Sequence, residues 1–144
     1  MKPRMTGLAN MQKRAFAANQ QSVGVIDKWV AEIARGAGLD DRTAFAARLC
    51  IAELANNVIQ HGLVTPDDQI TVTIHPSRER LDIEFQDTAR AFDPTSVSGR
   101  PAHSEAYEGG RGLMLIKSYA SDLRYWHDGR FNHVKLTFQS DDRD

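Results

Sequence analysis

The stretch that decides the fold is residues 53–61, which read ELANNVIQH. Within a predicted helix, Glu53, Asn57 and His61 form one stripe, because each step of four residues advances only about 40° around the axis. A second, apolar stripe lies beside it and is expected to face the core; its members are Ala47, Ile51, Leu54 and Val58. A carboxylate, a carboxamide and an imidazole at the margin of a buried face point to chemistry at a cleft.

The composition is that of an ordinary globular domain. The 144 residues suffice to bury roughly two thirds of the unfolded surface, and 41% of them are hydrophobic and 26% charged. A net charge of −1 gives no electrostatic case for nucleic acid or an anionic membrane. Neither a membrane span nor a secretory signal is recognisable, so we expect a cytoplasmic protein. The single cysteine, Cys50, is expected to be a buried apolar residue.

We expect one domain over residues 1–144, with roughly the first 12 residues outside its ordered part. Apolar periodicity predicts strands at 14–18, 69–75, 80–87, 123–126 and 131–138, and helices at 20–35, 41–61 and 113–120. Residues 36–38 should end the first helix, and Asp40 or Asp41 should cap the second. Short hairpins, including one at Asp128-Gly129, favour a mostly antiparallel mixed sheet with the helices on one face. The expected fold is an α/β two-layer sandwich.

The helix stripe contains two groups suited to phosphate chemistry. A glutamate beside an apolar face can deprotonate a hydroxyl or a water. The carboxamide oxygen of Asn57 can complete a Mg²⁺ shell that is otherwise made of phosphate and water oxygens. Taken alone, the spacing also fits the solvated margin of an amphipathic helix, and His61 before Gly62 fits a helix C-terminus.

A second motif ends a strand on Asp87, within residues 85–94, which read FQDTARAFDP. A buried carboxylate there can accept a hydrogen bond from an exocyclic amine such as that of adenine. It would reject a base with a carbonyl at that place, because two acceptors would face each other. Taken alone, the same residues fit an ordinary strand end followed by a turn.

A third motif is residues 108–113, EGGRGL, at a predicted helix start. Backbone amides freed by glycines at a helix N-terminus form an anion site, and Arg111 can reach a phosphate. A glycine-rich turn also arises for conformational reasons alone, and this one lacks the ending of a Walker A motif. The long loop-like stretch before it, 88–108, is typical of a binding loop or lid.

The order of these motifs resembles the ATP site of the GHKL superfamily, the Bergerat fold. There, a Glu…Asn…His helix is followed by an aspartate at a strand end, a long loop and a Gly-x-Gly helix start. The short length and the residues 110–116, GRGLMLI, most resemble the anti-sigma-factor serine/threonine-protein kinases of that superfamily. The resemblance extends from about Arg14 nearly to the end of the chain.

The resemblance implies that Glu53 is the general base that activates a serine hydroxyl, and that Asn57 coordinates the Mg²⁺ of Mg-ATP. Asp87 would bind the adenine amino group, and residues 110–112 would wrap the phosphates. The implied cofactor-binding residues are Asn57, Asp87, Gly110, Arg111, Gly112 and Leu113, the last as the anchor of its helix. The acceptor would be a serine of an anti-anti-sigma (STAS-domain) partner, a sigma factor would be a second partner, and the chain would form a homodimer.

Two positions depart from the family pattern. Ala89 replaces the glycine of the Asp-x-Gly adenine motif, and Asn132-His133 replaces the small or hydroxyl residues near the base. Ala89 favours an alternative of another class, a non-catalytic nucleotide-gated module that sequesters a sigma factor or another regulator. The retained Glu53 favours the kinase. The detached ATP-binding half of a histidine kinase ranks last, because His61 inside the nucleotide helix is a poor phosphoacceptor.

Overall fold

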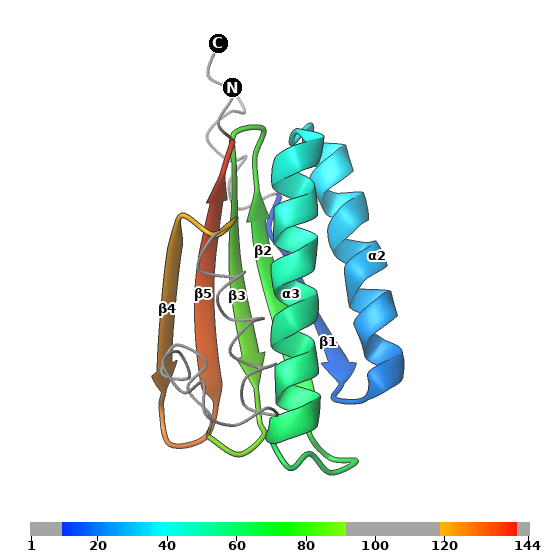
Figure 1. Cartoon of the computed structure of the whole chain (residues 1–144), viewed down its shortest axis with the longest axis vertical. Helices are drawn as coiled ribbons and strands as arrows, with labels where there is room; N and C mark the ends of the chain where they lie inside the picture. Colours follow the sequence, from blue (N-terminus) through cyan, green and yellow to red (C-terminus); the bar gives the residue numbers. More distant parts are fainter. Residues whose placement is uncertain (1–9, 92–118, 141–144) are drawn as a thin grey trace, which may run out of the picture.

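Two helices cover one face of an antiparallel sheet, with α3 over its middle and α2 toward the β1 edge (Figure 1). The computed structural model describes residues 10–91 and 119–140. Its elements are β1 (Gln12–Ala17), α2 (Gln20–Ala37), α3 (Asp41–His61), β2 (Gln69–Pro76), β3 (Arg80–Asp87), β4 (Asp122–His127) and β5 (Asn132–Gln139). The strand order is β1-β2-β3-β5-β4, and every pairing of these strands is antiparallel. The predicted two-layer sandwich is confirmed.

The element bounds differ from the predicted ones by a few residues at most. The first strand begins at Gln12, and α2 continues to Ala37 before Gly38 ends it in a left-handed conformation with φ 80°. Gly129 has φ 93° in the predicted β4–β5 turn. The helix predicted at 113–120 lies almost wholly outside the described residues. Of that stretch, only Tyr119 and Ala120 are described, and Tyr119 is helical.

The predicted cap of the second helix is right in position and wrong in chemistry. Asp40 is the N-cap residue of α3, but its side chain makes no capping hydrogen bond. Its Oδ1 atom is buried and has no hydrogen-bond partner. Asp40 therefore occupies the capping position without satisfying an amide of the first turn, whereas Asn19 caps α2 by accepting a hydrogen bond from the amide of Ser22 at 3.1 Å.

The hydrophobic core lies between the sheet and the helices. Alternate residues of β2, β3 and β5 point into it, and the apolar stripe of α3 packs against them as predicted, with Ile51 only 1% exposed. Cys50 is fully buried, and burial, with a smaller effect of the Glu53 charge, raises the pKa of its thiol to about 12. The prediction of a buried cysteine is confirmed, and a raised pKa disfavours the reactive thiolate form.

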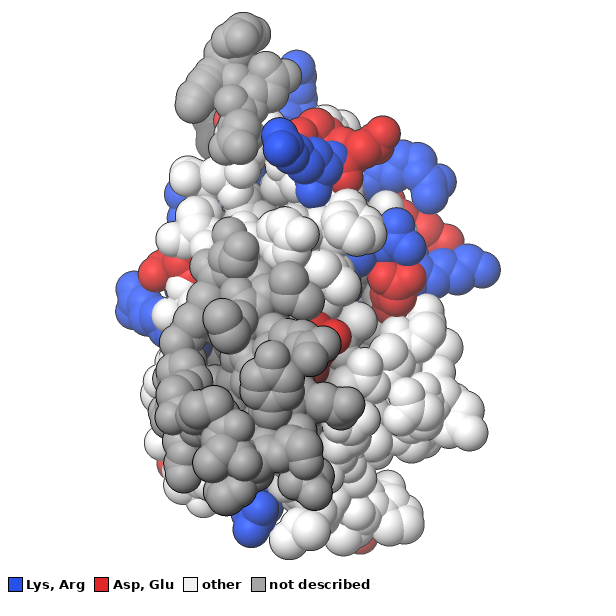
Figure 2. Space-filling model, in the orientation of Figure 1, with Lys and Arg blue, Asp and Glu red and all other residues white. Residues whose placement is uncertain are grey.

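Charged side chains of both signs alternate over one end of the helix face, and none of the visible regions is dominated by one sign (Figure 2). The two helices are joined by a bidentate ion pair, in which Arg48 of α3 donates two hydrogen bonds of 3.0 Å to Asp27 of α2. Within residues 10–91 and 119–140, neither helix is apolar enough over its length to cross a bilayer.

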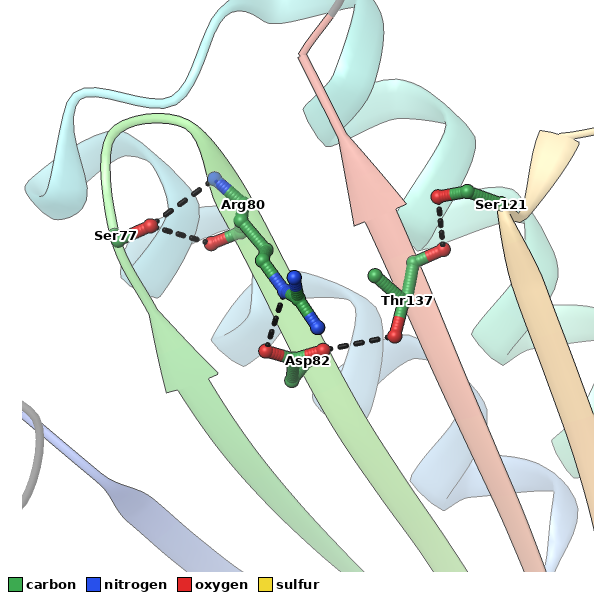
Figure 3. A network of polar contacts seen from close by, with 5 residues as sticks. All are labelled: Ser77, Arg80, Asp82, Ser121 and Thr137. Carbon is green, nitrogen blue, oxygen red and sulfur yellow. Dashed lines mark hydrogen bonds and ion pairs between the residues drawn. The ribbon is translucent and has the colours of Figure 1, made fainter.

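On the sheet face that the helices leave open, a polar network joins β3 to β5 (Figure 3). Thr137 donates to Asp82 Oδ1 at 2.8 Å, and Arg80 Nε donates to the other carboxylate oxygen at 2.9 Å. Ser77 closes the β2–β3 turn by donating to the carbonyl of Arg80 and accepting from its amide. This network lies near the start of β3, whereas Asp87 ends that strand.

Candidate nucleotide site

The helix stripe has a buried centre. Asn57 is 5% exposed, and Glu53 and His61 on either side of it are half-buried. The Nδ2 atom of Asn57 is buried and has no hydrogen-bond partner. Leaving a buried polar atom unpaired costs about 1–3 kcal/mol, so a carboxamide held in this way fits a residue that contacts a ligand.

Asp87 ends β3 with its carboxylate facing inward, and it is 4% exposed. Its Oδ1 atom accepts hydrogen bonds from the amide of Ala89 at 3.0 Å and from Nδ2 of Asn132 at 2.9 Å. Burial raises the pKa of Asp87, and these two hydrogen bonds partly offset that effect. Both donors contact Oδ1. No residue of the described ranges donates to Oδ2, which leaves that oxygen available to a ligand.

The Ala89 methyl group is accommodated by a glycine at the end of α3. A Cβ atom added to Gly62 would lie 2.8 Å from Ala89 Cβ and 2.6 Å from the carbonyl oxygen of Val58. Ala89 needs no left-handed backbone either, since Leu63 is the single non-glycine residue of the described ranges with positive φ. With alanine in place of the glycine of the Asp-x-Gly motif, the loop after β3 therefore still packs closely against the end of α3.

Arg90 ties the same loop to the last turn of α3. Its amide donates to the carbonyl of Gly62 at 3.1 Å, and its guanidinium donates to the carbonyl of His61 at 3.3 Å. These bonds bring the helix that carries Glu53 and Asn57 together with the strand end that carries Asp87, at one end of the domain. The other candidate residues, Gly110, Arg111, Gly112 and Leu113, lie outside the described residues.

From the sequence, Asn132 was noted only as a departure from the family pattern near the base, and it was given no role. Asn132 is 3% exposed, and its Nδ2 atom contacts Asp87 Oδ1 and the carbonyls of Ala89 at 3.1 Å and Arg90 at 3.2 Å. Its Oδ1 atom accepts a hydrogen bond of 2.6 Å from the Tyr125 hydroxyl. The sequence does contain a signal, since Asn132 is the polar member of the inward-facing set that continues with Val134, Leu136 and Phe138.

Comparison with known families gives the assignment. The model of the family described as the histidine kinase-like ATPase domain matches residues 16–138. The chain belongs to this family. The match includes α2, α3, β2, β3 and β4 in full, the end of β1 and all but the last residue of β5, so this domain accounts for nearly all of the described fold.

Relatives within the histidine kinase-like ATPase family are named as serine kinases, which confirms the resemblance drawn from the motifs. The chain is 30% identical over 117 residues to serine/threonine-protein kinase BtrW of Bordetella bronchiseptica, covering 78% of this chain and 82% of that protein. It is 28% identical over 107 residues to serine-protein kinase RsbW of Bacillus cereus, covering 64% of this chain and 66% of that one. This chain thus spans just under two thirds of the Bacillus protein.

A solved structure shows the same fold. The crystal structure of the RsbU and RsbW domains of Rv1364c from Mycobacterium tuberculosis aligns with a TM-score of 0.67 at 15% identity. The alignment covers 90% of this chain and 32% of that longer one. At this identity the likeness supports the ATPase-domain fold alone.

Gly62→Ala should destabilise this ATPase domain by roughly 1–3 kcal/mol, because the new methyl group would overlap a backbone oxygen and the Ala89 side chain. Urea denaturation measures the effect. Gly24→Ala is the matched control, since an added Cβ there meets nothing within 4 Å and the better helix propensity of alanine should stabilise α2 by up to about 1 kcal/mol. Equal midpoints for Gly62→Ala and the wild type would contradict the proposed close contact.

Proposed function

We propose that the chain is an ATP-dependent protein-serine kinase that also acts as an anti-sigma, partner-switching regulator. The observation that supports it best is the pair of buried polar groups, Asn57 and Asp87, each with an atom that no described residue satisfies. Elements that contact each other through Gly62 and Ala89 hold this pair. The names of the Bordetella and Bacillus relatives support the same activity.

The residues fit Mg²⁺ and an adenine nucleotide. Oδ2 of Asp87 suits the exocyclic amine of adenine, and the carboxamide of Asn57 suits a magnesium ligand. When bound, Mg²⁺ would neutralise charge on the transferring phosphates. In the described ranges, no group of three or more histidine, cysteine, aspartate or glutamate residues could hold a metal. We propose phosphate and water oxygens as the other ligands of the ion.

In the proposed reaction, the Glu53 carboxylate accepts the proton of a partner's serine hydroxyl. The serine oxygen forms a bond to the γ-phosphorus, the bond from that phosphorus to the β,γ-bridging oxygen breaks, and ADP leaves with the electron pair. Glu53 is half-buried, so solvent and a docked partner can reach it. We assign phosphate contacts to Gly110, Arg111 and Gly112, with Leu113 as the anchor of the following helix.

The proposed phosphate acceptor is a serine of an anti-anti-sigma, STAS-domain protein, and a sigma factor is the proposed second partner. A homodimer and a cytoplasmic location complete the proposal. The alternative, a non-catalytic nucleotide-gated binding module, was favoured by Ala89. Two observations weaken that support. Gly62 leaves room for the Ala89 methyl group, and the amide of Ala89 still donates a hydrogen bond to Asp87.

Calorimetric titration with Mg-ATP tests the nucleotide site. Asn57→Ala should weaken binding by roughly 100-fold or more, because the variant loses the proposed metal ligand. The fold should tolerate the change, since the buried Nδ2 atom makes no hydrogen bond that could be lost.

Asn56→Ala is the matched control on the same helix. Asn56 accepts a hydrogen bond from Gln20 of α2 at 3.3 Å and does not belong to the proposed site, so its replacement should leave the affinity unchanged. Equal affinities for the Asn57→Ala variant and the wild type would remove Asn57 from the site.

A further inference from the structure

We propose that Asn132 is a positioning residue that sets which base the site accepts, and that Tyr125 holds its amide in the required orientation. The inference rests on the proposed nucleotide function and on side-chain contacts of Asn132 that the family resemblance did not specify. Asn132 and Asp87 are direct partners in the β3–β5 register, and Tyr125 lies on the neighbouring strand β4. Three adjacent strands therefore contribute to one hydrogen-bonded relay.

The orientation of the Asn132 amide is fixed from both ends. Its Nδ2 atom faces three acceptors, namely Asp87 Oδ1 at 2.9 Å and the carbonyls of Ala89 and Arg90 at 3.1 and 3.2 Å. A reversed amide would place an oxygen against all three, which is electrostatically unfavourable. The Tyr125 hydroxyl donates to the Asn132 oxygen at 2.6 Å and so favours the same orientation.

This orientation determines which part of Asp87 is left for a ligand. With Oδ1 engaged by Asn132 and by the amide of Ala89, the carboxylate presents Oδ2 as its remaining acceptor. An amine on the base can donate to Oδ2, whereas a carbonyl at the same place would face its lone pairs. Selectivity therefore depends on keeping the carboxylate both fixed in rotation and ionised.

Asn132 also stabilises the loop that follows Asp87. Its contacts with the Ala89 and Arg90 carbonyls hold the segment that packs on Gly62. A shorter hydroxyl side chain at this position would reach fewer of these acceptors. The carboxamide thus compensates for the lost glycine of the Asp-x-Gly motif by holding the alanine-containing loop in place.

Binding of Mg-ATP and of Mg-inosine triphosphate, compared by calorimetry, tests the inference. The two nucleotides differ at the position of the exocyclic amine, which inosine replaces with a carbonyl. Asn132→Leu should reduce the preference for ATP at least tenfold, and Tyr125→Phe should reduce it several-fold. Thr137→Val is the matched control, because it removes a buried hydrogen bond from the same strand, to Asp82, and should leave the preference unchanged.

The pH dependence of ATP binding gives a second test, because a purely structural role of Asn132 would not change the pH at which binding is lost. The hydrogen bond from Asn132 lowers the pKa of Asp87, so Asn132→Leu should lose ATP binding at a higher pH than the wild type as the pH falls. The charged groups that act on Asp87 from neighbouring elements are Asp68, which raises this pKa, and His127, which lowers it. Both are unchanged in the variant.

The outcomes separate this inference from the proposed function. If the wild type binds no ATP, the proposed function fails and the inference fails with it. If the wild type prefers ATP but Asn132→Leu weakens both nucleotides equally and shifts no pH midpoint, the inference alone is wrong. Should Asn132→Leu not fold, Asn132→Ser and Tyr125→Phe decide by the same ratio, and an unchanged ratio in both overturns the role of Asn132.

Discussion

Glu53→Gln is expected to slow transfer of the γ-phosphate to a partner serine by about 10²–10⁴-fold, the usual contribution of a positioned general base. Binding of Mg-ATP should change little, because the proposed nucleotide contacts come from Asn57, Asp87 and the residues after the loop. Glutamine keeps the size and shape of the side chain but cannot take up the hydroxyl proton. The substitution should therefore lower the rate of phosphate transfer and leave the affinity for Mg-ATP nearly unchanged.

The measurement is the rate at which radiolabelled γ-phosphate moves from ATP to a purified STAS-domain protein, with ATP affinity measured in parallel by calorimetry. Glu32→Gln is the control, since Glu32 is an exposed glutamate of α2 outside the proposed site. Full transfer by the Glu53→Gln variant would show that another group, or no group, acts as the base.

Asp87→Asn is expected to abolish the preference for ATP and to favour inosine triphosphate instead. The amide oxygen of asparagine can still accept the hydrogen bonds from Ala89 and Asn132. The amide nitrogen then replaces Oδ2, the oxygen that we propose as the acceptor of the base amine. A donor at that position repels the amine of adenine and matches the carbonyl of inosine.

The same variant should be as stable as the wild type near neutral pH, or more stable. Burial raises the pKa of Asp87 above its unfolded value, so this group favours the fold at low pH and loses that contribution as the pH rises through its folded pKa. Asparagine has no such titration. The gain in unfolding free energy of the variant over the wild type should therefore be larger at about pH 7 than at about pH 4, near the ordinary aspartate pKa.

Urea denaturation at both pH values checks this second part. Asp82→Asn is the control on the same strand, because Asp82 is paired with Arg80 and Thr137 on the open face and its loss should bring no gain (Figure 3). Destabilisation of the Asp87→Asn variant at neutral pH would mean that the charged carboxylate supports the fold. If the Asp87→Asn variant gains stability and loses its preference for ATP, the result is the trade-off between stability and function that is typical of functional sites.

Much of the fold follows from local pattern. The alternation in β2 and β3 and the helical spacing in α3 predicted elements whose bounds the structure changes by one residue or less, because one face of each must be buried. The sequence placed Glu53, Asn57 and His61 at the margin of a buried face and left open whether Asp87 is buried or ends an ordinary strand. The structure buries both Asn57 and Asp87, whereas their chemical roles stay predictions.

The remaining features depend on contacts between distant segments. Asp40 has the residue type and position of a helix cap, but its side chain makes no capping hydrogen bond and one of its carboxylate oxygens is buried without a partner. Ala89 looked unfavourable by itself, because its effect depends on Gly62, which belongs to another element. The resemblance put Asn132 near the base, but its hydrogen bond to Asp87 could be recognised only once the β3–β5 register was known. Residues 110–113 lie outside the described ranges, so their roles also stay predictions.

The strand order has a consequence for how the domain holds together. Two local hairpins, β2–β3 and β4–β5, are joined by one long-range pairing, β3–β5, and residues 88–121 connect them along the chain. The same β3–β5 pairing places Asp87 opposite Asn132. A substitution that disrupts this one pairing should therefore separate the two hairpins and remove the proposed base site at the same time.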